Sequence, residues 1–382
     1  MYQLKRVESE KDWKNFINLP WTIYSKNPHW VPPLKIAVKD LLNVKKNPFF
    51  QHALMHPVIA YNEAGRCVGR IAGIIDENHN EFHKEKTAFF GFFESIDDQN
   101  LANLLFQEVE NWAKSKGMTL IRGPMNPSTN HECGLLVEGF EDSPTVMNTY
   151  NPPYYAKLVE TWGLTKSKDL IAYDIDSRKV KFSEKLMAQS EKLRQTGSVT
   201  FRTIDMKNFE AEVELILGIY NDAWEENWGF VPMTPDEFRH MAKDMKPIVD
   251  PELLLIAMVK GVPAGFALTL PDVNQAIKKI KNGKLFPSGL LKLLWHTKGP
   301  GKKKTINRCR ILTLGIKKDY RAYGIGPLLY VEFLKRGPDN GYPVGEASWI
   351  LEDNIPMNKA IQHMGGEKTK VYRVYDRPIM SV

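Results

Sequence analysis

The sequence contains few cysteines, and none of them is placed to form a cross-linked or metal-binding framework. Its 382 residues include only Cys67, Cys133 and Cys309, which lie far apart and form no C-x-x-C pair. Small secreted domains and zinc modules depend on dense or regularly spaced cysteines. The sequence therefore argues against both classes, and a reducing, cytoplasmic location is expected.

Long apolar runs are also missing. No stretch approaches the roughly 20 apolar residues that a membrane-spanning helix requires, and the opening MYQLKRVESEKDW lacks the apolar core of a signal peptide. Apolar side chains are nevertheless plentiful, since 18 Phe, 14 Tyr and 9 Trp are present. A chain of this length is expected to form two globular domains.

Acidic residues are absent from one segment, residues 273–318, which holds 13 Lys or Arg and no Asp or Glu. The rest of the chain carries 39 basic and 45 acidic residues, a net charge of −6. The protein is therefore a mildly acidic body with one basic block, and that block faces either something negative or water.

The expected order of helices and strands occurs twice. Each half contains a strand, helices, a β-hairpin, a strand, a helix, a strand, a helix and a closing strand. Such a repeat indicates two copies of one α+β unit rather than a single long domain. The sequence predicts domains at residues 1–176 and 199–382, joined by a connecting helix at 177–198, with a basic insertion at 273–307 in the second.

Residues 320–330, YRAYGIGPLLY, place two glycines between an apolar strand and a helix. The first N–H groups of a helix have no partner within the helix and carry partial positive charge. Glycines at this point allow a phosphate group to approach those donors closely. A lone G-x-G is weak evidence, because a plain tight turn also explains it.

The surrounding motifs make the pattern more specific. Arg321, Gly324 and Gly326 form R-x-x-G-x-G after a strand, Asn354 precedes Gly365 by eleven residues, and the chain closes with VYRVY. These features resemble the GNAT superfamily of N-acyltransferases over roughly residues 199–382. The resemblance implies two acyl-CoA N-acyltransferase-like domains in tandem, each a mixed, mostly antiparallel sheet flanked by helices.

The same resemblance implies an enzyme that moves an acyl group from acetyl-CoA, or another acyl-CoA, to a primary amine. The expected coenzyme-binding residues are Leu314, Gly315, Ile316, Arg321, Ala322, Tyr323, Gly324, Ile325, Gly326, Leu328 and Asn354. Acyl transfer needs a neutral amine and a proton for the departing sulfur. Glu346, Glu352 and Tyr375 are the catalytic candidates, while paired or packed structural roles remain open for Glu346, Tyr372 and Tyr375.

Two departures from the family pattern favour alternatives. Pro327 removes one N–H from the predicted phosphate loop, and Ile361 stands where many members carry a proton-donating tyrosine. A non-catalytic acyl-CoA-binding protein and an enzyme with an acyl-carrier-protein donor are therefore the alternatives. In the first half, Asp97 and Asp98 replace the glycine pair, so we expect a degenerate copy without a second donor site.

The acceptor is expected to be a small-molecule amine. Residues 122–155 form a long segment of irregular pattern, which is typical of a functional loop. Asn126, Asn130, Glu132, Tyr150 and Tyr154 are its candidate acceptor-binding residues. The segment could equally cover the sheet of a domain that lost its donor site.

No metal site is expected, because the histidine pairs in HALMH and HNEFH read as strand or loop and lack the H-E-x-x-H pattern. For the basic block, four interpretations stay open: donor phosphates, an acyl-carrier protein, an anionic membrane surface or nucleic acid, and a solvated face. Nucleic acid is not expected, since no recognition motif is present. Fem-type aminoacyl transferases, which use aminoacyl-tRNA, are also tandem proteins of this kind, but the glycine pair favours a coenzyme donor.

Overall fold

In the computed structural model, which describes residues 1–224, 227–301 and 305–380, the chain forms two compact units. Unit 1 contains residues 1–170, 277–290 and 370–382, and unit 2 contains residues 171–276 and 291–369. The boundaries differ from the predicted ones in three places. Residues 171–176 belong to unit 2, whereas part of the basic insertion and the end of the closing strand belong to unit 1.

Unit 1 is built on a mixed sheet in the order β1-β2-β3-β4-β5-β15-β9, and β8 also pairs with β15. Only β4 and β5 run parallel among the pairs whose register is described. The strands are β1 (Gln3–Arg6), β2 (Ala53–Tyr61), β3 (Cys67–Asp76), β4 (Thr87–Ser95), β5 (Leu120–Gly123), β8 (Leu135–Glu138), β9 (Thr165–Asp176) and β15 (Glu367–Pro378), with a small hairpin of β6 (Met125–Asn126) and β7 (Glu132–Cys133) beside them.

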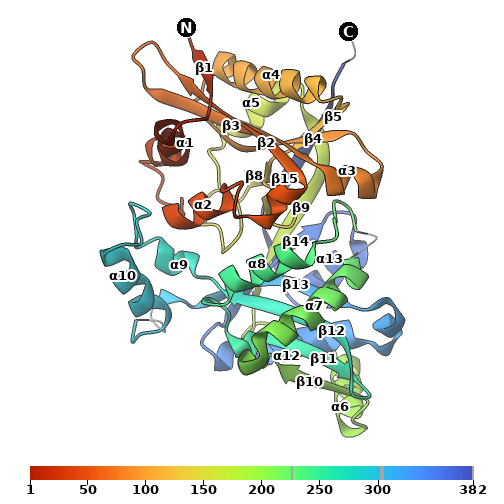
Figure 1. The fold of residues 1–382 in the computed structure, drawn as a ribbon. Helices are drawn as coiled ribbons and strands as arrows, with labels where there is room; N and C mark the ends of the chain where they lie inside the picture. Colours follow the sequence, from red (N-terminus) through yellow and green to blue (C-terminus); the bar gives the residue numbers. More distant parts are fainter. Residues whose placement is uncertain (225–226, 302–304, 381–382) are drawn as a thin grey trace. The chain divides into compact units, whose positions relative to one another are not determined.

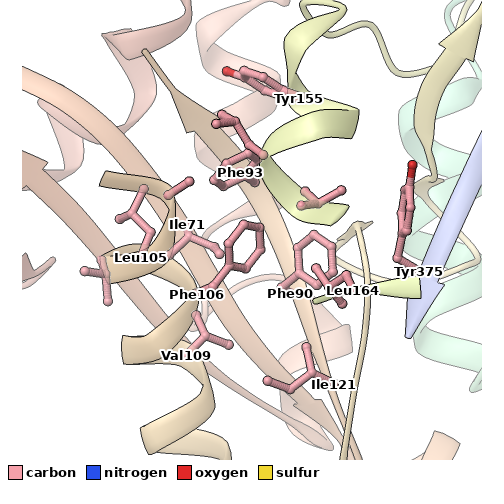
Figure 2. Packing of buried hydrophobic residues seen from close by; sticks show 14 of the residues in the cluster. Ile71, Phe90, Phe93, Leu105, Phe106, Val109, Ile121, Tyr155, Leu164 and Tyr375 are labelled. Atoms are coloured by element: carbon pink, nitrogen blue, oxygen red, sulfur yellow. The ribbon is translucent and has the colours of Figure 1, made fainter. Parts of the chain in front are cut away.

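Helices cover both faces of this sheet. Successive side chains along β3 point to opposite faces and therefore contact different helices. Gly69 and Gly73 face α4 (Gln99–Ser115), where a β-carbon would meet Leu105 and Trp112. Arg70 points to the opposite face and donates to the Phe16 carbonyl of α1 (Glu10–Ile23). Figure 1 shows α4 and α5 (Tyr154–Thr161) side by side, and Figure 2 shows the aromatic core beneath them. The remaining elements are α2 (Lys35–Leu41), η1 (Pro48–Gln51) and α3 (Glu77–His83).

Unit 2 repeats the plan with the sheet order β9-β14-β13-β12-β11-β10, in which β13 and β14 are parallel. The strands are β10 (Val199–Thr203), β11 (Leu254–Val259), β12 (Val262–Pro271), β13 (Arg308–Ile316) and β14 (Val344–Leu351). Along β11, Leu255 and Ala257 enter one apolar cluster, whereas Leu254 and Ile256 enter another. The sheet is therefore buried on both faces.

The helices of unit 2 divide between these two clusters. The first cluster lies under α12 (Ile325–Asp339) and α13 (Ile355–His363), and the second under α7 (Phe209–Trp224) and α8 (Pro235–Met245). The other elements are α6 (Glu184–Gln195), η2 (Met206–Asn208), η3 (Pro251–Leu253), α9 (Asn274–Ile277), α10 (Ser288–Thr297) and η4 (Lys318–Tyr323). No helix in the described ranges is long and apolar enough to cross a membrane.

The closing strand differs from the prediction, which assigned all of it to the second domain. From Lys370 onward β15 belongs to unit 1, where Tyr375 pairs with Gly123 of β5 and Arg373 with Leu135 of β8. Tyr375 is fully buried in the core of unit 1 and donates a hydrogen bond to Glu160, 3.0 Å away. Burial raises the pKa of its phenol. A packing role for Tyr375 follows from this position.

The predicted loop around His79 and His83 is also corrected, because these residues lie on the short helix α3. The Asp76 side chain caps the helix by accepting from the His79 backbone N–H. The buried His79 ring lies 3.3 Å from Glu85, and burial lowers its pKa to about 4. Over the described part of the chain, no cluster of three potential metal ligands occurs.

Candidate active site

The glycine pair lies where β13 of unit 2 is followed by η4 and α12. Gly324 adopts the left-handed conformation, with φ of 70°, and ends η4 as the residue before α12. A residue with a β-carbon is strained at this φ, which explains the first glycine. Among the residues that the structure describes, a β-carbon at Gly326 would meet Ile316 Cδ1 alone, at 3.4 Å, so these residues leave open space above the first turn of α12.

The N-terminus of α12 has no side-chain cap. The corresponding helix of unit 1, α4, is capped by Asp98, whose carboxylate accepts from the N–H groups of Asn100 and Leu101 at 2.8 and 3.1 Å. A carboxylate at a helix N-terminus satisfies the same donors that would otherwise hold a phosphate. The two units therefore differ at the position where an anionic donor would bind.

The loop before α12 is held in place by the end of α7. The Lys318 backbone N–H donates to Asp222 at 2.9 Å, and the Arg321 guanidinium donates to the Ala223 carbonyl at 3.0 Å. Both bonds lie within unit 2, and the Arg321, Ala322 and Tyr323 side chains are exposed. The predicted phosphate loop is thus fixed by hydrogen bonds and open to solvent.

Strands β13 and β14 stay paired over only part of their length. The parallel register joins Arg308–Ile311 to Val344–Ala347, although β13 continues to Ile316 and β14 to Leu351. On the other edge, Lys317 N–H donates to Ala264 beside β12. By the alternation of a strand, the N–H groups of Leu314 and Ile316 point toward the side of β14. They can therefore polarise a carbonyl placed where the pairing ends.

Glu346 lies in the middle of β14 and is completely buried. Its carboxylate accepts from the Ser348 hydroxyl at 2.8 Å and lies 3.9 Å from the Arg308 guanidinium. Arg308 also binds both carboxylate oxygens of Asp174 at 2.7 Å. This enclosure favours the paired, structural interpretation of Glu346 that the sequence left open.

Sequence reasoning missed the buried residues around Glu346. Arg310 pairs with Glu346 across the two strands, is fully buried and stacks on Trp349 at 4.7 Å from the ring centre. Its guanidinium also donates to the Ser348 carbonyl at 3.3 Å. The sequence did contain a sign of this buried group, since Arg308 and Arg310 alternate in the apolar strand RCRILTLGI. Apolar strands rarely bury arginine unless it has a fixed partner.

Glu352 follows β14 and is half-buried, which makes it the more accessible of the two predicted carboxylates in unit 2. Asn354 caps α13, since its side chain accepts from the Met357 backbone N–H at 3.2 Å. That cap explains the asparagine without a coenzyme. A role in donor binding remains a prediction for Asn354.

Asn358, one turn further along α13, is the more connected asparagine. Its amide donates to the carbonyls of Leu351 and Asn354, both at 2.9 Å, and its oxygen accepts from Tyr173 at 2.9 Å. Asn358 is buried. It therefore ties the end of β14 to the first turn of α13.

Replacing Asn358 with Ala is expected to cost about 2 kcal/mol of unfolding free energy, because buried polar partners lose their hydrogen bonds. Asn354→Ala removes only an exposed cap and should cost about 1 kcal/mol. Urea denaturation of both variants, with the exposed Lys359→Ala as control, checks the difference. Equal midpoints for the two asparagine variants would contradict the assigned role of Asn358.

The position expected for a catalytic tyrosine is occupied by Ile361, which is fully buried in the apolar cluster beneath α12 and α13. Besides Tyr173, the hydroxyl of Tyr330 also reaches this helix and donates to Met357 Sδ at 2.8 Å. Tyr330 is buried, and burial raises its pKa. Neither Ile361 nor Tyr330 is placed as an accessible proton donor.

The predicted acceptor-binding residues all lie in unit 1 and are bound to their own unit. Asn126 accepts from the Phe92 backbone N–H at 2.7 Å, and its strand pairs it with Glu132. The backbone N–H of Asn130 donates to the Ser128 hydroxyl at 3.2 Å. These contacts shape the small β6–β7 hairpin.

Tyr150 and Tyr154 likewise fasten the segment to the rest of unit 1. Tyr150 donates to the Phe140 carbonyl at 2.9 Å, and Tyr154 donates to the Ser95 carbonyl at 2.7 Å. Burial raises the pKa of both phenols. The contacts favour the view that residues 122–155 cover the sheet, and acceptor binding by these residues stays a prediction.

Unit 1 contains a buried carboxylate that sequence reasoning also missed. Glu94, near the end of β4, accepts from the hydroxyls of Tyr155 and Tyr24 at 2.7 and 2.9 Å. Arg70 lies 3.4 Å from its other oxygen. Burial raises the pKa of Glu94 despite the arginine. This network rigidifies the end of β4 beside the Asp98-capped helix.

Comparison with known proteins covers almost the whole chain, although no family model matches it. Protein YghO of Escherichia coli (strain K12) is 36% identical over 376 residues, 97% of this chain and 94% of that protein. Bacterial ceramide synthase of Caulobacter vibrioides (strain NA1000 / CB15N) is 36% identical over 378 residues, 98% of this chain and 96% of that protein. A solved tandem GNAT protein from the clavulanic acid biosynthesis pathway has a TM-score of 0.56 and 12% identity, with 100% of both chains covered. The predicted tandem GNAT fold is confirmed.

Proposed function

Because the chain belongs to the family of bacterial ceramide synthase and protein YghO, within the tandem GNAT fold, we propose that it is an N-acyltransferase. It takes an acyl group from an acyl-CoA bound by unit 2 and transfers the group to a primary amine. The observation that carries the proposal is the uncapped N-terminus of α12, with open space at Gly326. The equivalent helix of unit 1 is closed by Asp98.

The donor loop supplies backbone N–H groups to the pyrophosphate of coenzyme A. Ile325, Gly326 and Leu328 have N–H groups in the first turn of α12, whereas Pro327 has none. Their partial positive charge is directed at the incoming anion. The proline removes one hydrogen bond, so donor affinity depends more on the remaining three groups.

The reaction forms a C–N bond and breaks the C–S bond of the thioester. The N–H groups of Leu314 and Ile316 stabilise the carbonyl oxygen as negative charge develops on it. The attacking nitrogen must lose a proton, and Glu352, the more accessible of the two predicted carboxylates, accepts it through water. With Ile361 in place of a tyrosine, the departing thiolate takes its proton from water.

The acceptor we propose is a long-chain amine. Ceramides are amides of a long-chain amino alcohol, and the relative named bacterial ceramide synthase covers 98% of this chain. An acyl-CoA with a long chain is the matching donor, although a carrier-protein thioester would present the same reactive group. The proposal thus includes both partners of the amide bond.

The test follows amine-dependent release of coenzyme A thiol from the intact protein. Acetyl-CoA, palmitoyl-CoA and a palmitoyl-carrier protein serve as donors, and sphinganine, a short alkylamine and an amino acid serve as acceptors. Release with palmitoyl-CoA and sphinganine above the amine-free rate supports the proposal. Donor binding without release for any amine would instead identify a non-catalytic acyl-CoA-binding protein.

A further inference from the structure

The helix α10 presents an unusual group of exposed apolar side chains. Leu291, Leu294 and Trp295 are 72%, 44% and 56% exposed. They fall within five consecutive positions of the helix, and we call them the α10 patch. Exposed apolar side chains gathered in this way mark an interaction surface, whereas single ones are ordinary.

The three members of the α10 patch share one face of the helix. Leu291, Leu294 and Trp295 are spaced i, i+3 and i+4, so their side chains lie next to one another on α10. Gly289 of the same helix is buried, and Leu290 and Leu293 are half-buried. The helix therefore exposes three of its five large apolar side chains to solvent.

The short helix is held in shape by contacts with neighbouring residues. A β-carbon at Gly289 would lie 2.2 Å from the Lys284 carbonyl oxygen, so the helix starts tightly against the preceding turn. Beyond its end, Gly301 lies beneath the Trp295 ring, where a β-carbon would be 2.6 Å from Nε1. His296 bonds to Thr305 at 2.6 Å. The patch is thus a preformed surface.

The segment leading into α10 is anchored within unit 1. Trp21 Nε1 donates to the Lys281 carbonyl at 2.9 Å, and the Lys35 backbone N–H donates to the Gly283 carbonyl at 2.9 Å. Gly283 packs so closely on Trp21 that a β-carbon would lie 2.4 Å from the ring. These contacts involve backbone groups and a buried glycine, so they fix the position of residues 281–283 on unit 1.

The segment that carries the α10 patch has charged side chains of one sign. Lys281, Lys284, Lys292 and Lys298 are exposed on or beside α10. They belong to the basic block of residues 273–318, which contains no Asp or Glu, in a chain that is otherwise net acidic. A charge-complementary partner must therefore be anionic over this surface.

We propose that the α10 patch docks the protein on the surface of an anionic lipid bilayer. Tryptophan and leucine on one face, flanked by lysines, are the composition of helices that lie in the membrane interface. Each lysine near an anionic bilayer adds to the electrostatic attraction. An acidic carrier protein would pair with the lysines, but it would not bury the exposed apolar side chains in an apolar environment as a bilayer does. Docking rests on the patch alone and holds whether or not the proposed acyl transfer occurs.

The test measures flotation of the intact protein with vesicles. Phosphatidylcholine vesicles containing 30% phosphatidylglycerol should bind the protein at low salt, and pure phosphatidylcholine vesicles should not. The double variant Leu291→Glu, Trp295→Glu should reduce the bound fraction at least about tenfold, because it removes the apolar contact and adds two negative charges that the anionic surface repels. A matched control, Leu104→Glu with Val262→Glu, changes the net charge equally at exposed apolar positions outside the basic block.

Each outcome decides the proposal. Loss of binding in the α10 variant alone, with retained binding in the control, supports it. Absence of binding to phosphatidylglycerol vesicles, or equal losses in both variants, overturns it, as does capture of an acidic carrier protein through the patch without vesicle binding. Thermal unfolding and coenzyme A affinity of the α10 variant should match the native protein. Unchanged coenzyme A affinity separates failure of docking from failure of the proposed function.

Discussion

Gly326→Asp is expected to weaken binding of acyl-CoA at least about 100-fold, which corresponds to about 2.8 kcal/mol. The new carboxylate would stand in the open space above the first turn of α12, where only Ile316 lies near. It would meet the pyrophosphate with like charge at the second residue of α12, within the turn whose N–H groups the donor needs. Isothermal titration calorimetry with palmitoyl-CoA measures the change.

The control for this variant is Gly197→Asp, which adds the same charge at an exposed turn of unit 2 with no described atom within 4 Å; its φ of 64° also matches the backbone strain that Gly324→Asp introduces at 70°. Its affinity for palmitoyl-CoA should equal that of the native protein. Adding Gly324→Asp to Gly326→Asp should leave no measurable binding. Native affinity in the double variant would show that the donor binds elsewhere and would remove the basis of the assigned site.

Gly91→Ala should destabilise the protein by about 3 kcal/mol or more, since overpacking against immobile groups forces the backbone to shift. A β-carbon at Gly91 would lie 1.8 Å from the Met125 carbonyl oxygen and 2.9 Å from its carbon. The clash is with backbone, so no side-chain rotation relieves it. The glycine allows the segment after β5 to cross closely over β4, and urea denaturation measures its contribution.

Gly218→Ala provides the opposite result in the same assay. Gly218 lies within α7, with no atom within 4 Å of a new β-carbon. Alanine in a helix is favoured over glycine by about 0.5–1 kcal/mol, so this variant should be slightly more stable than the native protein. If Gly91→Ala unfolded at the native urea midpoint, the close approach of β4 and Met125 would be absent in solution.

The order of elements and the glycine turn before α12 could be predicted because both depend on local sequence patterns. Helix periodicity and the Gly324–Gly326 spacing depend only on residues close together in the chain. The contrast between the two units was visible for the same reason, since Asp98 occupies the N-cap position in one and Gly324 in the other. Local rules of capping decide which helix can receive an anion.

The division of the closing strand could not be predicted in this way. Strand pairing is set by the tertiary fold, and Tyr375 pairs with Gly123, more than 250 positions earlier in the chain. Nothing in VYRVY distinguishes a partner in one unit from a partner in the other. The catalytic assignment of Tyr375 depended on that choice of unit, and its burial in the core of unit 1 gives it a packing role instead.

The two asparagines of α13 show a second limit. Asn354 has the family spacing to Gly365, yet Asn358 makes the larger set of buried hydrogen bonds. A sequence gives the spacing between residues but not which side-chain amide faces the core. Asn354 and Asn358 are one helical turn apart, and the sequence does not show which of them is buried. The same applies to residues 122–155, where polar side chains that suggested an acceptor site bond to their own unit.

Mass spectrometry of the product is the most direct test of the proposed N-acyltransferase activity. The intact protein is incubated with isotopically labelled palmitoyl-CoA and sphinganine, and the lipid extract is analysed for the labelled amide. The account predicts labelled N-palmitoyl sphinganine from the native protein and from Gly197→Asp, and none above background from Gly326→Asp. Absence of the amide from the native protein with every donor and amine tested, despite tight acyl-CoA binding, would contradict it.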